Sequence, residues 1–194
     1  MVLVVGDPQS GLSDVVSRIT ECAPTSLRLS EQPAECLDQL GSLAEALDAR
    51  QDVPPCIVTP RLDVLLSAVP EAAQAALITA VTRLARAAEE SGTAVLVPSR
   101  PGGTVLRRLA TAASSLIALS MRSVDHWLEL DLPRDRWRQR GPEGRGLWGG
   151  QAIQCARAVE TRAQAHPLPP VVERPSWTQV VHRAERLVVV GDDL

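Results

Sequence analysis

The sequence predicts an α/β fold in which a mostly parallel β-sheet is covered by helices. Short all-apolar runs alternate along the chain with longer segments whose apolar residues recur at helical spacing. This order of elements favours parallel strands joined by helices. The chain has 194 residues, of which 45% are hydrophobic, so it is long enough for one substantial domain and too apolar for general disorder.

The beginning of the chain predicts a strand, a glycine-bounded turn and a helix. Val2–Val5 is all apolar, as expected for a strand that is buried on both faces. The turn spans residues 6–11 and the helix spans residues 12–22. The apolar face of this helix contains Val15, Val16 and Ile19.

Strand and helix signals then alternate as far as residue 120. Further strands are expected at residues 25–30, 56–59, 93–97 and 115–120. One helix places Leu37, Leu40, Ala44 and Leu47 on a single stripe, and a second, at residues 71–90, turns Leu77, Val81, Leu84 and Ala88 inward. A turn at Pro101, Gly102 and Gly103 precedes a helix near residues 105–113. The predicted core therefore contains five parallel strands.

The character of the chain changes after Asp131, where arginine, proline and glycine become dense. Residues 146–156 predict a β-hairpin that turns at Gly149 and Gly150. Residues 166–175 are typical of an extended connector, and residues 186–190 predict a last apolar strand. We therefore divide the chain into a module at residues 1–158 and a proline-rich connector with a terminal strand at residues 159–194.

Composition excludes several classes of protein. The longest uncharged stretch, residues 109–121, is shorter than a bilayer span, and no signal-peptide core precedes Asp7. We therefore expect a cytoplasmic protein without direct membrane insertion. The net charge of -3 supplies no general attraction for nucleic acid and mildly favours a protein partner. The chain contains no lysine, so all 20 cationic side chains are arginine.

We expect the cysteines, histidines and tryptophans to have packing or surface roles rather than catalytic or metal-binding roles. The cysteines contain no CxxC pair, so we interpret them as small core residues and not as a zinc or disulfide framework. The histidines have no partners at metal-ligand spacing. The tryptophans are core residues in at least two cases, with docking as the alternative. These residues are Cys22, Cys36, Cys56 and Cys155; His126, His166 and His182; and Trp127, Trp137, Trp148 and Trp177.

The first turn has the pattern of a phosphate-binding loop, GxxxxG-x-[ST], between a buried strand and a helix. Such a loop surrounds an anion with backbone N–H groups and the positive end of the helix. Ser13 could offer its hydroxyl to Mg²⁺, but Leu12 stands where a lysine would bind phosphate, a loss of about 1.5–3 kcal/mol. A plain turn capped by Ser13 is the alternative. The candidate nucleotide-binding residues are Gly6, Asp7, Pro8, Gln9, Ser10, Gly11, Leu12 and Ser13.

The end of the third strand lacks the acidic residues that a nucleotide hydrolase needs for its metal ion and its attacking water. Thr59 and Pro60 stand there, while Asp63 already belongs to the following helix. Together with Leu12, this second departure predicts weak or absent hydrolysis.

A cluster of arginines surrounds Trp137. In an extended segment, alternate spacing would align four of these residues on one side, where they could touch phosphates or an acidic partner. A solvated loop balanced by neighbouring acids is the alternative. The cluster consists of Arg134, Arg136, Arg138, Arg140 and Arg145.

These motifs resemble the FtsK/SpoIIIE family of RecA-like P-loop motors, especially the tandem modules of actinobacterial FtsK-like proteins and of the EccC component of type VII secretion. Residues 2–13 resemble the family's Walker A motif without its lysine, and residues 56–66 resemble its Walker B motif without the acidic pair. Residues 93–100 resemble the strand that ends in a polar sensor, which implies Ser99 and Arg100. Residues 144–158 resemble a family-specific hairpin, although Glu143 replaces the usual proline, and residues 188–194 resemble the lead-in to a next module.

The resemblance implies a RecA-like fold, ATP with Mg²⁺ as weakly bound ligands, and other ATPase modules as partners in a hexameric ring that moves DNA or secreted protein. Three hypotheses follow. The first is a degenerate module with a structural, regulatory or partner-binding role. The second is an active ATPase whose missing groups come from arginines of its own or of a neighbour. The third is a decayed, free-standing remnant.

Overall fold

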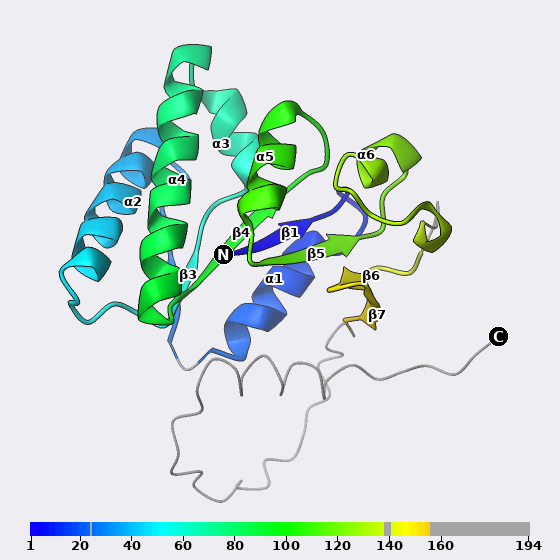
Figure 1. The fold of residues 1–194 in the computed structure, drawn as a ribbon, viewed down its shortest axis with the longest axis horizontal. Helices are drawn as coiled ribbons and strands as arrows, with labels where there is room; N and C mark the ends of the chain where they lie inside the picture. The colour runs from blue at the N-terminus through cyan, green and yellow to red at the C-terminus, as the bar shows by residue number, and fades with distance from the viewer. Residues whose placement is uncertain (24, 138–140, 156–194) are drawn as a thin grey trace, which may run out of the picture.

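The computed structural model describes residues 1–23, 25–137 and 141–155 (Figure 1). The elements follow one another as β1 (Val2–Val5), α1 (Leu12–Glu21), β2 (Leu27–Arg28), α2 (Pro33–Asp48), β3 (Cys56–Val58), α3 (Leu62–Ala68), α4 (Glu71–Ser91), β4 (Ala94–Ser99), α5 (Thr104–Ala112), β5 (Ser115–Leu119), α6 (Val124–Leu128), the 3-10 helix η1 (Arg134–Arg136), β6 (Arg145–Trp148) and β7 (Gln151–Gln154).

One seven-stranded sheet organises these elements, in the order β2-β3-β4-β1-β5-β6-β7. The first five strands of that order pair in parallel, with β1 between β4 and β5. The predicted five-stranded parallel core is therefore confirmed. β1, β3 and β4 are almost completely buried, which explains why their sequences are continuously apolar rather than alternating.

The two faces of the sheet are covered unequally, as Figure 1 shows. The larger apolar cluster joins one face to α2, α3, α4 and α5, and includes the predicted inward residues Leu77, Val81, Leu84 and Ala88. On the opposite face the packed helix is α1, whose Leu12, Val15 and Val16 pack with strand residues in a smaller cluster. The molecule is thus a layered α/β/α structure.

The predicted β-hairpin is also confirmed. β6 pairs antiparallel with β5 and β7 pairs antiparallel with β6, so the hairpin extends the sheet beyond its parallel part. Gly149 and Gly150 form the turn with φ values of 56° and 80°. Positive φ at both central residues is the geometry of the two-residue turn that fits the twist of paired strands.

Two expectations for the region after β5 differ from the structure. The segment from Arg134 to Arg136 is a 3-10 turn and not an extended strand, so the predicted one-sided row of arginines is wrong there. The short helix α6 was not predicted because five residues are too few to show a helical period. Ser123 begins α6 by accepting hydrogen bonds from the backbone N–H groups of Asp125 and His126.

The small and aromatic core residues follow the sequence analysis with one exception. Cys36, Cys56 and Trp127 are buried, but Cys22 is exposed at the end of α1, because it lies past the last buried turn of that helix. Trp137 and Trp148 are half-buried against the two apolar clusters. Trp177, the connector and the last predicted strand lie outside the described residues. In the described part of the chain, no helix is long and apolar enough to cross a membrane.

Candidate functional site

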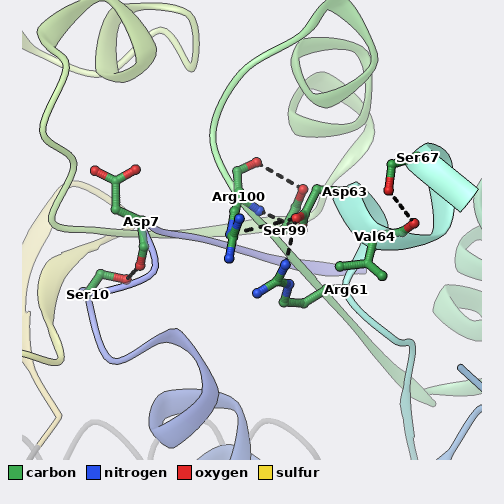
Figure 2. Close-up of polar contacts among 8 residues, drawn as sticks. All are labelled: Asp7, Ser10, Arg61, Asp63, Val64, Ser67, Ser99 and Arg100. Carbon is green, nitrogen blue, oxygen red and sulfur yellow. Dashed lines mark hydrogen bonds and ion pairs between the residues drawn. The ribbon is translucent and has the colours of Figure 1, made fainter.

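The candidate site lies at the edge of the sheet where the parallel strands have their carboxyl ends. Since β1, β3 and β4 run in the same direction, the segments that follow them meet at this edge. The helices that follow β1 and β4 pack on opposite faces of the sheet, and a crevice at such a point is where open α/β sheets bind ligands. Figure 2 shows Asp7 and Ser10 from the loop after β1, and Arg61, Asp63 and Arg100 from the segments after β3 and β4.

The loop after β1 is tightly folded on itself. The Gly6 N–H donates to the Ser99 carbonyl at 3.2 Å, which ties the loop to the end of β4. The Ser10 N–H and hydroxyl both donate to the Asp7 carbonyl, at 2.9 and 2.7 Å. A β-carbon on Gly6 would lie 2.2 Å from the Ser10 hydroxyl, so this loop requires glycine at its first position.

The loop passes into α1 through Gly11, which has the left-handed φ of 77°. Gly11 is the N-cap, and no side chain caps the first turn within the described structure. The expected capping role of Ser13 is therefore wrong, because Ser13 is already the second residue of the helix. The uncapped N–H groups of the first turn carry the partial positive charge that attracts anions.

Leu12 points away from any ligand at this edge. Its side chain is 5% exposed and packs with Val4, Val15 and Val16 between α1 and the sheet. The position that would hold a phosphate-binding lysine is thus part of the apolar core.

The polar residues at the ends of β3 and β4 are turned toward the backbone. Thr59 is 3% exposed, and its hydroxyl lies 3.0 Å from the Pro60 carbonyl. Ser99 is equally buried, and its hydroxyl donates to the Arg100 carbonyl at 3.0 Å. Both hydroxyls therefore already have acceptors. The end of β3 carries no carboxylate.

Asp63 is the carboxylate closest in sequence to the end of β3, and two arginines hold it. Arg61 donates to its Oδ2 at 2.9 Å, and the Arg100 Nε lies 3.8 Å from the same oxygen. The Arg100 backbone N–H donates to Oδ1 at 3.1 Å. The carboxylate charge is therefore compensated by protein groups (Figure 2). Over the described ranges, no group of three or more His, Cys, Asp or Glu residues could hold a metal ion.

Arg122 is a member of the site that the sequence analysis missed. Its backbone N–H donates to the Asp7 Oδ2 at 2.6 Å, and its guanidinium group donates to the Gln9 side-chain oxygen. These contacts join the segment after β5 to the loop after β1, beside an open pocket of about 570 Å³ that Asp7, Gln9 and Arg122 help to line. No local sequence signal marks Arg122, because its place in the site depends on the pairing of β1 with β5, which brings the segments after both strands together.

The segment before the hairpin packs against the other side of the same loop. The Gly144 N–H donates to the Ser10 carbonyl at 2.8 Å. A β-carbon on Gly11 would lie 2.9 Å from the Gly144 nitrogen, so the two glycines allow the close approach. The segment that leads into the hairpin is thus in direct contact with the candidate nucleotide loop.

Of the five arginines in the predicted cluster, two lie at the same pocket in the described structure. Arg136 and Arg145 line a second pocket, of about 120 Å³, whose floor includes Trp127 and Leu147. Arg134 is exposed on η1, and Arg138 and Arg140 lie outside the described residues. His126 is half-buried on α6, and His166 and His182 lie outside the described part.

Among solved structures, the chain is similar to the cytoplasmic domain of the Thermomonospora curvata type VII secretion ATPase EccC. The TM-score is 0.60 at 14% sequence identity, over 82% of this chain and 24% of that chain. The chain therefore spans about a quarter of the length of that structure. No family model matches the sequence, and no curated protein matches it. The likeness shows that the two structures share an α/β fold.

Proposed function

We propose that this chain is a degenerate ATP-binding module of an FtsK/SpoIIIE-type translocase, in which a structural, regulatory or partner-binding role replaces hydrolysis. The single observation that carries the proposal is the burial of Leu12, which is 5% exposed, in the core beneath the candidate nucleotide loop. A lysine that contacts phosphate has to reach out of this position, whereas Leu12 stabilises the contact between α1 and the sheet.

The end of β3 supports the same proposal. Metal-assisted phosphoryl transfer uses carboxylates that hold Mg²⁺ and orient the attacking water. Here Thr59 and Pro60 offer none, and the Asp63 carboxylate is engaged by Arg61 and Arg100. Ser13 alone remains as a candidate Mg²⁺ ligand from the loop.

The proposed partners are other ATPase modules of the same or neighbouring chains, with secreted protein or DNA as the cargo. The similar structure belongs to a type VII secretion ATPase, and this chain spans 24% of its length, as expected for one module of a larger assembly. The net charge of -3 favours a protein cargo over DNA.

A second candidate function is an active ATPase that replaces the missing lysine with an arginine. The observation in its favour is Arg122, whose guanidinium group already contacts Gln9 in the candidate loop. Arginine can donate charge-assisted hydrogen bonds to phosphate oxygens as lysine does.

Steady-state phosphate release with Mg²⁺ and ATP separates the two functions. Ser13→Ala removes the remaining Mg²⁺ ligand, and Ser17→Ala, in the same helix, is the matched control. We expect wild type and both variants to release phosphate only at the background rate. Turnover that is lost in Ser13→Ala but kept in Ser17→Ala would establish the active ATPase instead.

A further inference from the structure

Two arginines share one carboxylate at the ends of β3 and β4. Arg61 and Arg100 both approach the Asp63 Oδ2, at 2.9 and 3.8 Å. Two positive charges against one negative charge leave this group with a net charge of about +1. The two guanidinium groups approach the same oxygen atom of Asp63, so their positive charges are held close together (Figure 2).

These arginines also have donors that Asp63 does not satisfy. The Arg61 Nε is buried and has no hydrogen-bond partner among the described residues. The Arg100 side chain is 45% exposed, and its ion pair with Asp63 uses Nε, which leaves the terminal nitrogens available. The Arg61 Nε has no exposed surface for a ligand to reach, so an oxyanion would be contacted through the partly exposed ends of the two side chains, which are 32% and 45% exposed.

The position of the arginine pair connects it to the candidate nucleotide loop. Arg100 directly follows Ser99, whose carbonyl accepts the Gly6 N–H at 3.2 Å. The pair therefore stands at the same edge as the glycine-bounded loop and the uncapped start of α1. Both features favour a phosphate group over the carboxylate of a peptide, because backbone N–H groups and guanidinium groups together match its several oxygens.

From this arrangement we infer that Arg61 and Arg100 form a phosphate site that binds a nucleoside di- or triphosphate without a divalent cation. This inference rests on the proposed function, because it assigns the ligand chemistry of the same degenerate site. Two guanidinium groups repel Mg²⁺ from the place where an ATPase carries acidic metal ligands, and they neutralise the phosphate charge themselves. Binding in the presence of a chelator is the direct consequence.

Calorimetric titration in EDTA tests the site with ATP, ADP, pyrophosphate and adenosine. We expect ATP, ADP and pyrophosphate to bind and adenosine not to bind. Added Mg²⁺ should change the ATP affinity by less than about threefold in either direction. Arg61→Gln and Arg100→Gln should each weaken ATP binding about tenfold to hundredfold, the range for losing a charge-assisted hydrogen bond. Arg86→Gln, an exposed change on α4, is the matched control and should bind as wild type does.

Asp63→Asn distinguishes two roles of this carboxylate, because the two roles predict opposite changes in nucleotide binding. If Asp63 competes with the ligand for the arginines, removing its charge should tighten ATP binding several-fold in EDTA, while the amide oxygen keeps the hydrogen bond from the Arg100 N–H. If Asp63 holds a metal ion, the same change should weaken Mg²⁺-dependent binding.

Three results would overturn the inference: no binding of any phosphate compound at millimolar concentration, ATP binding that requires Mg²⁺, or unchanged binding in both arginine variants. None of these results by itself contradicts the proposed loss of hydrolysis. Conversely, phosphate release above background would contradict the proposed function even if the arginine pair binds as inferred.

Discussion

The chemistry of the candidate loop depends on the direction of one side chain. Leu12 follows the second glycine of the loop, where the phosphate-loop pattern places a lysine, and it packs inward with Val4, Val15 and Val16. The absence of lysine is visible in the sequence, but its structural consequence is not, because a leucine on the first turn of a helix can face either side. The structure shows that Leu12 is part of the core.

Leu12→Ala should therefore destabilise the fold. Truncating a buried leucine removes transfer free energy and leaves a cavity, so the free energy of unfolding should fall by about 2–5 kcal/mol. Leu128→Ala is the matched control, because Leu128 is 40% exposed and should change stability by less than about 0.5 kcal/mol. Equal effects of the two variants in urea unfolding would contradict the packing described for Leu12.

Two buried thiols give the fold a pH dependence at the alkaline end. Burial raises the pKa of the Cys36 thiol to about 11, and burial also raises the pKa of Cys56 to about 11 although Arg28 opposes the shift. Below the unfolded value of about 8.5 both states hold the proton, so stability is unaffected. Above it the unfolded state loses protons first, so stability falls as pH rises toward 11.

We expect urea unfolding to show this loss between pH 8 and pH 10, at about 2 kcal/mol for each thiol. Combined replacement of Cys36 and Cys56 by alanine should flatten the decline. Cys22→Ala should leave it unchanged, because Cys22 is exposed. The assignment fails if the double variant keeps the slope of the wild-type protein.

At the scale of elements, the hairpin of β6 and β7 supports the loop after β1, although more than 130 residues separate the two segments in the sequence. The hairpin enters through Gly144, whose N–H donates to Ser10 and whose carbonyl accepts the Cys155 N–H at 2.9 Å. The loop is therefore held by β4 through Ser99, by the segment after β5 through Arg122 and by the hairpin through Gly144.

Two glycines with nearly equal dihedral angles allow this contact to be tested. Gly144 and Gly150 have φ values of 79° and 80°, so alanine costs about the same backbone strain at either position. A β-carbon on Gly144 would lie 2.4 Å from the Cys155 carbonyl oxygen, whereas one on Gly150 meets nothing within 4 Å. Gly144→Ala should therefore lose about 1–3 kcal/mol more than Gly150→Ala in urea unfolding. Similar losses would show that the close approach is unimportant.

The elements that the sequence predicts well are those with enough residues to show a pattern. The four apolar runs that became β1, β3, β4 and β5, and the long helix α4, are close to their predicted bounds. β2 has only Leu27 and Arg28, because the ends of the alternating run at residues 25–30 make no strand pairing. The contact of Arg122 with Gln9 could not be predicted, because it depends on strand order rather than on local sequence.

At the scale of the whole molecule, the parallel sheet keeps the architecture of a ligand site while the residues at its edge differ from those of a phosphate hydrolase. β1, β3 and β4 bring the loop, the hydroxyl pair of Thr59 and Ser99, and the arginine pair to one edge. The described part of this edge presents guanidinium groups where a hydrolase presents carboxylates. We therefore expect the module to act by binding and contact within an assembly rather than by turnover.

Single-turnover phosphate release is the most direct test of this account, because it detects even one slow cycle. The protein is held in molar excess over ATP in the presence of Mg²⁺, and wild type is compared with Ser13→Ala. We expect both proteins to release phosphate only at the rate at which ATP hydrolyses on its own. A phosphate signal that wild type produces and Ser13→Ala abolishes would contradict it.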